Sequence, residues 1–242
     1  MSDGLNLKIK LFADGADLKV ISQMSKNPLI KGFTTNPTLM RKSGVTDYKG
    51  FAEEALRIVL DRPISFEVFS DDFSEMEEQA MEIASWGKNV YVKIPVSNTR
   101  GEFSGPLIKQ LASAGVQLNV TALMTVRQVE QVLKCLSDRT QSCVSVFAGR
   151  VADTVRDPIP LMAEAVKVLK SNALAELIWA SPRELLNIFQ ADSVGCHIIT
   201  STHDILAKLA LVGKDLDVFS LETVKMFYED AASAKFAIKV VS

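Results

Sequence analysis

Short apolar runs alternate with longer amphipathic stretches between about residues 7 and 202 of the chain. Runs rich in branched aliphatic side chains are typical of buried parallel strands, whereas apolar residues at three- and four-residue spacing predict helices laid on a sheet. The apolar runs predict strands over residues 7–13, 30–36, 63–70, 89–96, 116–123, 142–149, 175–181 and 196–202. The clearest helical stretches cover residues 51–60, 73–87, 125–138 and 157–171.

The order of these elements predicts an α/β fold. Eight strands, each followed by a helix, within about 200–250 residues predict a (β/α)8 barrel, also called a TIM barrel. An open doubly wound sheet uses the same alternation and is the alternative fold. No linker-like or low-complexity segment interrupts the pattern, so we predict one domain over residues 1–242. The tail SLETVKMFYEDAASAKFAI predicts an appended helix over about residues 221–238.

Composition limits the classes of partner. The chain has 242 residues, 48% of them hydrophobic, and a net charge of −2 without a long run of either sign. It therefore lacks the basic surface expected of a protein that binds nucleic acid or an anionic membrane. The three cysteines have no CxxC spacing, and the first ten residues lack the apolar core of a signal peptide. We expect a cytoplasmic protein that binds neither nucleic acid nor membrane.

Polar residues recur near the C-terminal ends of the predicted strands, which is the end where TIM barrels carry their active sites. One such Ser or Thr could simply be a satisfied buried group or a helix cap. The same feature on six strands predicts a site, because barrel interiors are usually filled with branched aliphatic side chains. The residues concerned are Asp14, Thr34, Asn36, Glu67, Lys93, Asn119, Thr121 and Ser145, with Phe147 on the same face as Ser145.

Lys93 carries the candidate chemistry, because it lies among Val90, Val92 and Ile94 in the run NVYVKIPVS. A lysine amine normally has a pKa of about 10.4, and burial lowers that value by disfavouring the charged form. A neutral amine is a nucleophile that forms a Schiff base with a ketone. The alternative is a structural ion pair between Lys93 and Asp14 or Glu67, and the sequence leaves both interpretations open.

Metal and nucleotide chemistry have no support in the sequence. The chain has two histidines, His197 and His203, and neither HxH nor HExxH spacing occurs. Neither GxGxxG nor GxxxxGK[ST] occurs, and these motifs are typical of dinucleotide and phosphate-binding loops. We therefore expect a reaction without metal or cofactor.

Five motifs follow one another through nearly the whole chain: GFTTNPTL at 32–39, YVKIPVS at 91–97, QLNVTAL at 117–123, SVFAGRVAD at 145–153 and WASPRE at 179–184. In this order they resemble the motif series of the transaldolase family. The resemblance implies a (β/α)8 barrel that performs class I (Schiff-base) aldol chemistry on ketose phosphates, without metal or organic cofactor. It also implies a role in the pentose phosphate pathway and a homo-oligomer, since short family members form rings in which the C-terminal helix packs on a neighbour.

The resemblance also assigns roles to individual residues. Lys93 matches the Schiff-base lysine, Asp14 matches the aspartate that moves protons to and from sugar hydroxyls, and Glu67 matches the carboxylate that acts through a catalytic water beside Thr121. The positions that match residues binding the dihydroxyacetone portion are Thr34, Asn36, Asn119 and Ser145. The positions that match the phosphate-binding set are Arg150, Ser181 and Arg183.

The resemblance favours one of three functions. The family's free aldolases carry tyrosine at the position of Phe147 and glutamine at that of Glu67, so this chain resembles the branch that transfers a dihydroxyacetone unit from a ketose phosphate to an aldose phosphate. Free cleavage of fructose 6-phosphate and a non-catalytic sugar-phosphate-binding barrel are the alternatives. Gly15 in FADGADL, Val146 in place of the usual proline after the serine, and Pro182 in place of the usual aromatic depart from the family pattern and could alter the substrate.

Overall fold

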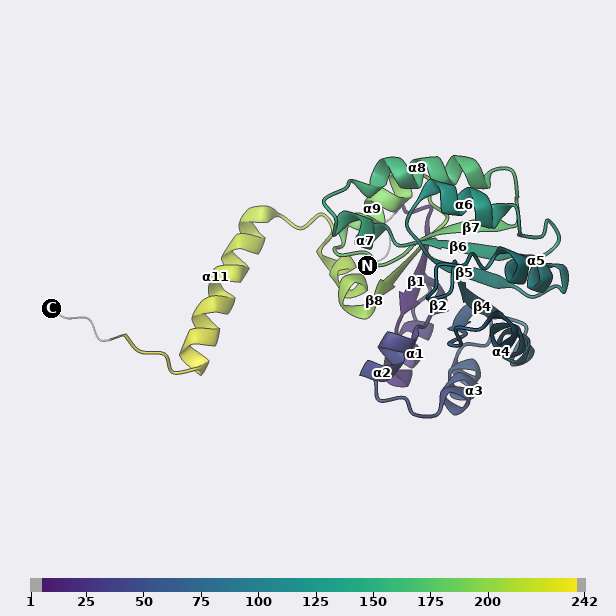
Figure 1. The fold of residues 1–242 in the computed structure, drawn as a ribbon. Coiled ribbons are helices and arrows are strands. Elements are labelled where there is room, and N and C mark those ends of the chain that lie inside the picture. The colour runs from purple at the N-terminus through teal and green to yellow at the C-terminus, as the bar shows by residue number, and fades with distance from the viewer. Residues whose placement is uncertain (1–5, 239–242) are drawn as a thin grey trace. The chain divides into compact units, whose positions relative to one another are not determined.

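The strands form a closed parallel barrel in the computed structural model, which describes residues 6–238. Residues 1–5 and 239–242, which the predicted domain includes, lie outside the described part. The strands are β1 (Lys10–Asp14), β2 (Ile30–Thr34), β3 (Ile64–Glu67), β4 (Val90–Pro95), β5 (Leu118–Leu123), β6 (Ser142–Val146), β7 (Ala175–Trp179) and β8 (Ile198–Thr202) (Figure 1). Because β1 pairs with both β2 and β8, the predicted barrel is confirmed and the open sheet is excluded.

Helices connect the strands, with two helices after β2 and two after β6. They are α1 (Leu18–Ser25), α2 (Pro37–Lys42), α3 (Tyr48–Ile58), α4 (Phe73–Ser85), α5 (Gly105–Ser113), α6 (Val126–Leu133), α7 (Ala148–Ala152), α8 (Pro158–Leu169), α9 (Leu186–Ser193) and α10 (His203–Ala207). Most begin at a residue that accepts a hydrogen bond from a free N–H of the first turn. Asp17 and Asp72 act in this way, and Thr125 and Gln128 form a capping box.

Several strands end earlier than the sequence pattern predicts, and the helices that follow β2 and β6 explain two of these cases. The predicted strand 30–36 ends at Thr34, and Asn36 caps α2 with its side chain. Pro37 is the first residue of α2; it has no N–H to continue a strand ladder and fits the first turn of a helix. Likewise, the predicted strand 142–149 ends at Val146, because Ala148 begins α7.

An aromatic layer fills the barrel interior below its polar end. The buried cluster consists of Phe12, Tyr91, Cys143, Ile178, Ala180 and Ile198, with Phe147 packed against it. Gly32 makes room for this layer, because a Cβ atom there would lie 2.4 Å from the Phe12 ring. Side chains two residues apart share a face of a strand, so Lys93 lies directly above Tyr91 on the C-terminal side.

The described chain divides into two compact units, one ending at Leu206 and the other beginning at Ala207. The second unit contains a short 3-10 helix, η1 (Lys208–Leu211), and α11 (Leu216–Ser233). The sequence predicts this helix at about 221–238, and the structure corrects both ends: it begins at Leu216, where the Asp215 side chain accepts hydrogen bonds from two N–H groups of the first turn, and it ends at Ser233. No residue of α11 is buried. Among the described residues, no helix has the length and apolar character needed to cross a membrane.

Candidate active site

Lys93 lies at the centre of the site, 7% exposed, in the middle of β4. Glu67 and Lys93 are neighbours in the β3–β4 register, so their side chains point to the same interior face. The Lys93 Nζ atom lies 2.9 Å from a carboxylate oxygen of Glu67 and donates a hydrogen bond of 2.8 Å to the carbonyl oxygen of Thr35. Of the two ion pairs considered from the sequence, the one with Glu67 is therefore present.

Asp14 ends β1 and lies within electrostatic range of Lys93 and Glu67. Its carboxylate accepts a 2.7 Å hydrogen bond from the Thr34 hydroxyl, which lies 2.6 Å from the hydroxyl of Thr200 on β8. A hydroxyl has one proton to donate, so Thr200 is the donor to Thr34. Burial raises the pKa of Asp14 above its usual value, while Lys93 and the Thr34 hydroxyl oppose the shift.

Asn119 links three strands on the other side of Lys93, its neighbour in the β4–β5 register. The Ser145 hydroxyl donates to Asn119 Oδ1 at 2.7 Å, and Asn119 Nδ2 donates to the Ser65 hydroxyl at 3.0 Å. The Asn119 side chain is fully buried, and both its oxygen and its nitrogen form hydrogen bonds, which fixes the orientation of the amide. Thr121 lies two residues further along β5, and its buried hydroxyl has no hydrogen-bond partner among residues 6–238.

Asn36 and Phe147 lie just beyond the ends of their strands. Asn36 Oδ1 accepts a hydrogen bond from Leu39 N at 2.9 Å, so this oxygen serves as the cap of α2. The half-buried Phe147 ring packs on the interior aromatic layer, and the guanidinium of Arg150 lies 5.3 Å above its centre. This distance is within the range of a cation–π contact.

The phosphate-binding candidates gather where α7 meets the loop after β7. A Cβ atom at Gly149 would lie 1.5 Å from the Ser181 carbonyl oxygen and 3.4 Å from Arg183 Nε, so only glycine allows this close approach. Ser181 adopts a left-handed backbone conformation, with φ of 56°. Arg183 binds the carboxylate of Asp153 through two nitrogens, and this pairing lowers the pKa of Asp153.

The structure adds residues that the sequence analysis did not select. Ser65 and Thr200 belong to the interior hydrogen-bond networks, and strand alternation could have found them, because each lies two residues from a polar residue of the same strand, Glu67 or Thr202. The Thr35 carbonyl has no comparable signal, because its role depends on which backbone groups the neighbouring strand leaves unpaired. Among the described residues, no group of three or more His, Cys, Asp and Glu side chains could hold a metal ion.

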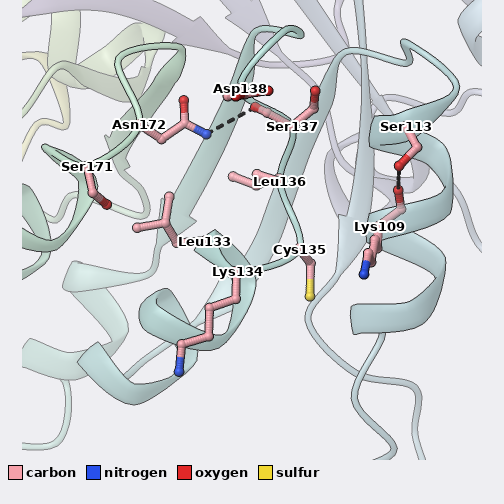
Figure 2. A pocket seen from close by; sticks show the side chains of 10 residues that line it. All are labelled: Lys109, Ser113, Leu133, Lys134, Cys135, Leu136, Ser137, Asp138, Ser171 and Asn172. Atoms are coloured by element: carbon pink, nitrogen blue, oxygen red, sulfur yellow. Dashed lines mark hydrogen bonds between the residues drawn. The ribbon is translucent and has the colours of Figure 1, made fainter.

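A surface pocket of about 450 Å³ lies at the other end of the barrel (Figure 2). Its walls come from the C-terminal parts of α5 and α6 and from the turns that lead into β6 and β7. Two of its hydrogen bonds join Asn172 to Ser137 and Ser113 to Lys109. Burial raises the pKa of its Cys135 thiol, which disfavours the reactive thiolate. The pocket therefore adds no group to the chemistry around Lys93.

Comparison with known proteins shows the family. The sequence model described as Transaldolase/Fructose-6-phosphate aldolase matches residues 11–240. A "Probable transaldolase" of Dehalococcoides mccartyi is 33% identical over 202 residues, which are 83% of this chain and 90% of that protein. "Probable transaldolase 2" of Listeria monocytogenes is 34% identical over 83% of this chain and 88% of that protein.

The protein is a TIM barrel that holds a buried lysine near two carboxylates at the C-terminal ends of its strands. The chain belongs to the Transaldolase/Fructose-6-phosphate aldolase family, as its sequence motifs indicated. Among solved structures, KGPDC from Streptococcus mutans is similar in fold, with a TM-score of 0.56 over 83% of this chain and 90% of that chain at 12% identity. That likeness concerns the fold alone.

Proposed function

We propose that this enzyme transfers a dihydroxyacetone unit from a ketose phosphate to an aldose phosphate through a Schiff base on Lys93. The observation that carries the proposal is the buried Lys93 amine, held by Glu67 and by the Thr35 carbonyl at the end of the barrel where catalytic residues gather. Asp14, Thr34 and Asn119 surround it with groups that can exchange protons or bind sugar hydroxyls.

The first step forms the Schiff base. The Lys93 ammonium passes a proton to the Glu67 carboxylate, 2.9 Å away, and the neutral amine adds to the C2 carbonyl of the ketose phosphate. One N–H proton of the adduct moves to the former carbonyl oxygen, which gives a carbinolamine with a hydroxyl at C2. The Glu67 carboxyl then returns its proton to the departing hydroxyl, water leaves, and an iminium ion remains on Lys93. The buried hydroxyl of Thr121, which has no hydrogen-bond partner in the described part of the chain, is suited to hold this water.

The second step breaks and remakes a carbon–carbon bond. Asp14 takes the proton of the C4 hydroxyl, the C3–C4 bond breaks, and its electron pair moves into the iminium to give an enamine as the aldose phosphate leaves. The enamine carbon then attacks the acceptor aldehyde, and Asp14 returns the proton to the new hydroxyl. Burial raises the pKa of Asp14, which makes its carboxylate a stronger base for this transfer. Water finally releases the product and restores the amine.

Phe147 supports transfer over free cleavage. Release of dihydroxyacetone requires protonation of the enamine carbon, whereas transfer requires the enamine to survive until an acceptor binds. Phe147 has no hydroxyl to donate or to orient a proton-donating water, and its ring faces the barrel interior. The Glu67 carboxylate, ion-paired with Lys93, is the second feature of the transferring type.

We expect fructose 6-phosphate to form glyceraldehyde 3-phosphate steadily only when erythrose 4-phosphate is also supplied, and to release little free dihydroxyacetone in either case. Phe147→Tyr is expected to raise acceptor-independent release about tenfold, because a phenol can help to protonate the enamine. Coupled assays with and without acceptor measure both rates. Phe219→Tyr adds the same hydroxyl to α11, outside the barrel unit, and should leave the ratio unchanged. Steady dihydroxyacetone release by the wild type without acceptor, as fast as glyceraldehyde 3-phosphate forms with acceptor, would show a free aldolase instead.

We also propose that the protein is a homo-oligomer and that α11 takes part in its interfaces. The helix exposes a series of large apolar side chains, including Leu221, Val224 and Phe227 at three-residue spacing. Exposed apolar surface of this kind is typical of protein–protein contacts.

Phe227→Glu is expected to shift the protein to a smaller species, because it places a charge within this apolar surface. Light scattering coupled to size exclusion measures the mass. Lys225→Glu on the same helix is the matched control, which changes charge without removing apolar surface and should keep the wild-type mass. A wild type that runs as a monomer at every concentration would contradict the proposal.

A further inference from the structure

The hydrogen-bond ladder between β2 and β3 stops where it reaches the active site. Phe33 N donates to Pro63 O at 2.8 Å, and Thr35 N donates to Ser65 O at 3.1 Å. A regular parallel ladder would continue with Glu67 N donating to the Thr35 carbonyl, and then with the N–H of residue 37 donating to the Glu67 carbonyl. Residue 37 is a proline and has no N–H.

The hydroxyl of Tyr48 takes the place of both missing bonds. It accepts a hydrogen bond from Glu67 N at 2.8 Å and donates one to Glu67 O at 2.7 Å. The Thr35 carbonyl is therefore available to Lys93 Nζ, which it binds at 2.8 Å. Without the Tyr48 hydroxyl, the next acceptor along the ladder for the Glu67 N–H would be the Thr35 carbonyl. The Glu67 N–H and the Lys93 amine would then compete for the same oxygen.

The phenol is held firmly in this position. Tyr48 begins α3, whose cap is Asp47, and its ring lies 5.4 Å from the Phe69 ring in an edge-to-face contact and 6.0 Å from the Trp86 ring. Trp86 in turn contacts Phe66 on β3 at 5.8 Å. Burial raises the pKa of Tyr48, which keeps the phenol protonated and able to donate. The hydroxyl thus joins an aromatic cluster on the outer side of β3 to the backbone of Glu67.

We infer that Tyr48 is a positioning residue for the lysine chemistry: its hydroxyl fixes the backbone of Glu67 and leaves the Thr35 carbonyl for the Lys93 amine. The kinetic part of this inference rests on the function proposed above. The Tyr48 hydroxyl contacts backbone atoms of the residue that carries the carboxylate, so it acts through Glu67 and Lys93. A shift of Glu67 of about 1 Å is enough to slow a proton transfer strongly.

Tyr48→Phe tests the inference, because it removes the hydroxyl and keeps the ring. Tyr91→Phe is the matched control: its hydroxyl is also bonded, at 2.9 Å to Gln141, but at the other end of the barrel interior. We expect Tyr48→Phe to lower kcat and the rate of borohydride trapping on Lys93 about tenfold, with KM within about twofold. Tyr91→Phe should change the melting temperature by a similar amount and leave both rates near the wild type. Equal rates in the two variants would overturn the inference.

Hydrogen exchange gives a readout that does not depend on catalysis or on a variant folding. The Glu67 amide of the wild type should be strongly protected, and in Tyr48→Phe it should exchange at least about tenfold faster. An unprotected Glu67 amide in the wild type would overturn the inference even if Tyr48→Phe did not fold. Failure of the proposed function would look different: no trapping of wild-type Lys93 with any ketose phosphate, with the protection of Glu67 unchanged.

Discussion

Lys93→Met is expected to reduce turnover by at least about a thousandfold, because no other described amine lies in the barrel interior beside Asp14 and Glu67 to form the Schiff base. Borohydride reduction in the presence of fructose 6-phosphate should add the mass of the three-carbon unit to the wild type and not to the variant. Substantial activity in the methionine variant would place the carbonyl chemistry on another residue.

The same variant should also lose stability, by about 2 kcal/mol, because methionine leaves the Glu67 carboxylate largely buried without its partner. Adding Glu67→Gln removes that unpaired charge, so the double variant should regain most of the loss while remaining inactive. Thermal or urea unfolding of the two variants measures the difference. This pairing separates the two roles of Lys93: stability returns in the double variant, whereas trapping does not.

Strand alternation predicted most of the interior of the site. Lys93, Glu67, Asn119 and Ser145 could be assigned to one barrel end, because side chains two apart share a face and the ends of parallel strands meet. The structure pairs Lys93 with Glu67 and Ser145 with Asn119, and Lys93 and Asn119 are neighbours in the β4–β5 register. The same rule applies to Ser65 and Thr200, whose hydroxyls belong to the interior hydrogen-bond networks.

Contacts between distant segments could not be predicted in this way. The role of Tyr48 depends on where the β2–β3 ladder stops, and the availability of the Thr35 carbonyl depends on the same point. Pro37 can be read from the sequence. That its missing N–H leaves the Glu67 carbonyl on β3 without a ladder partner follows only from the β2–β3 register. Asn36 is a case in which a local signal was sufficient. An Asn directly before a Pro is typical of a helix start, but the alternation pattern assigned Asn36 to the strand, whereas its side chain caps α2.

The pairing of Arg183 with Asp153 changes the expectation for the phosphate end. The resemblance to the family implies phosphate-binding roles for both Arg150 and Arg183, but the Arg183 guanidinium is already bound by the Asp153 carboxylate. A substrate phosphate would have to displace Asp153 before it could use Arg183. Arg150 lies over the Phe147 ring, and a planar guanidinium in such a contact retains its N–H donors for a phosphate. We therefore expect Arg150 to contribute more to phosphate binding.

Arg150→Gln is expected to raise KM for phosphorylated donors about 100-fold and to leave KM for free dihydroxyacetone within a few-fold, because a charge-assisted hydrogen bond to phosphate is worth about 1.5–3 kcal/mol. Arg183→Gln should have a smaller effect, and Asp153→Asn should lower KM for phosphorylated donors by releasing Arg183. Arg156→Gln, in the loop that follows α7, is the matched control and should behave as the wild type. Steady-state kinetics with both kinds of donor measure these ratios. An equal loss on phosphorylated and unphosphorylated donors in Arg150→Gln would remove the phosphate role from Arg150 and leave its contact with Phe147 as the better explanation.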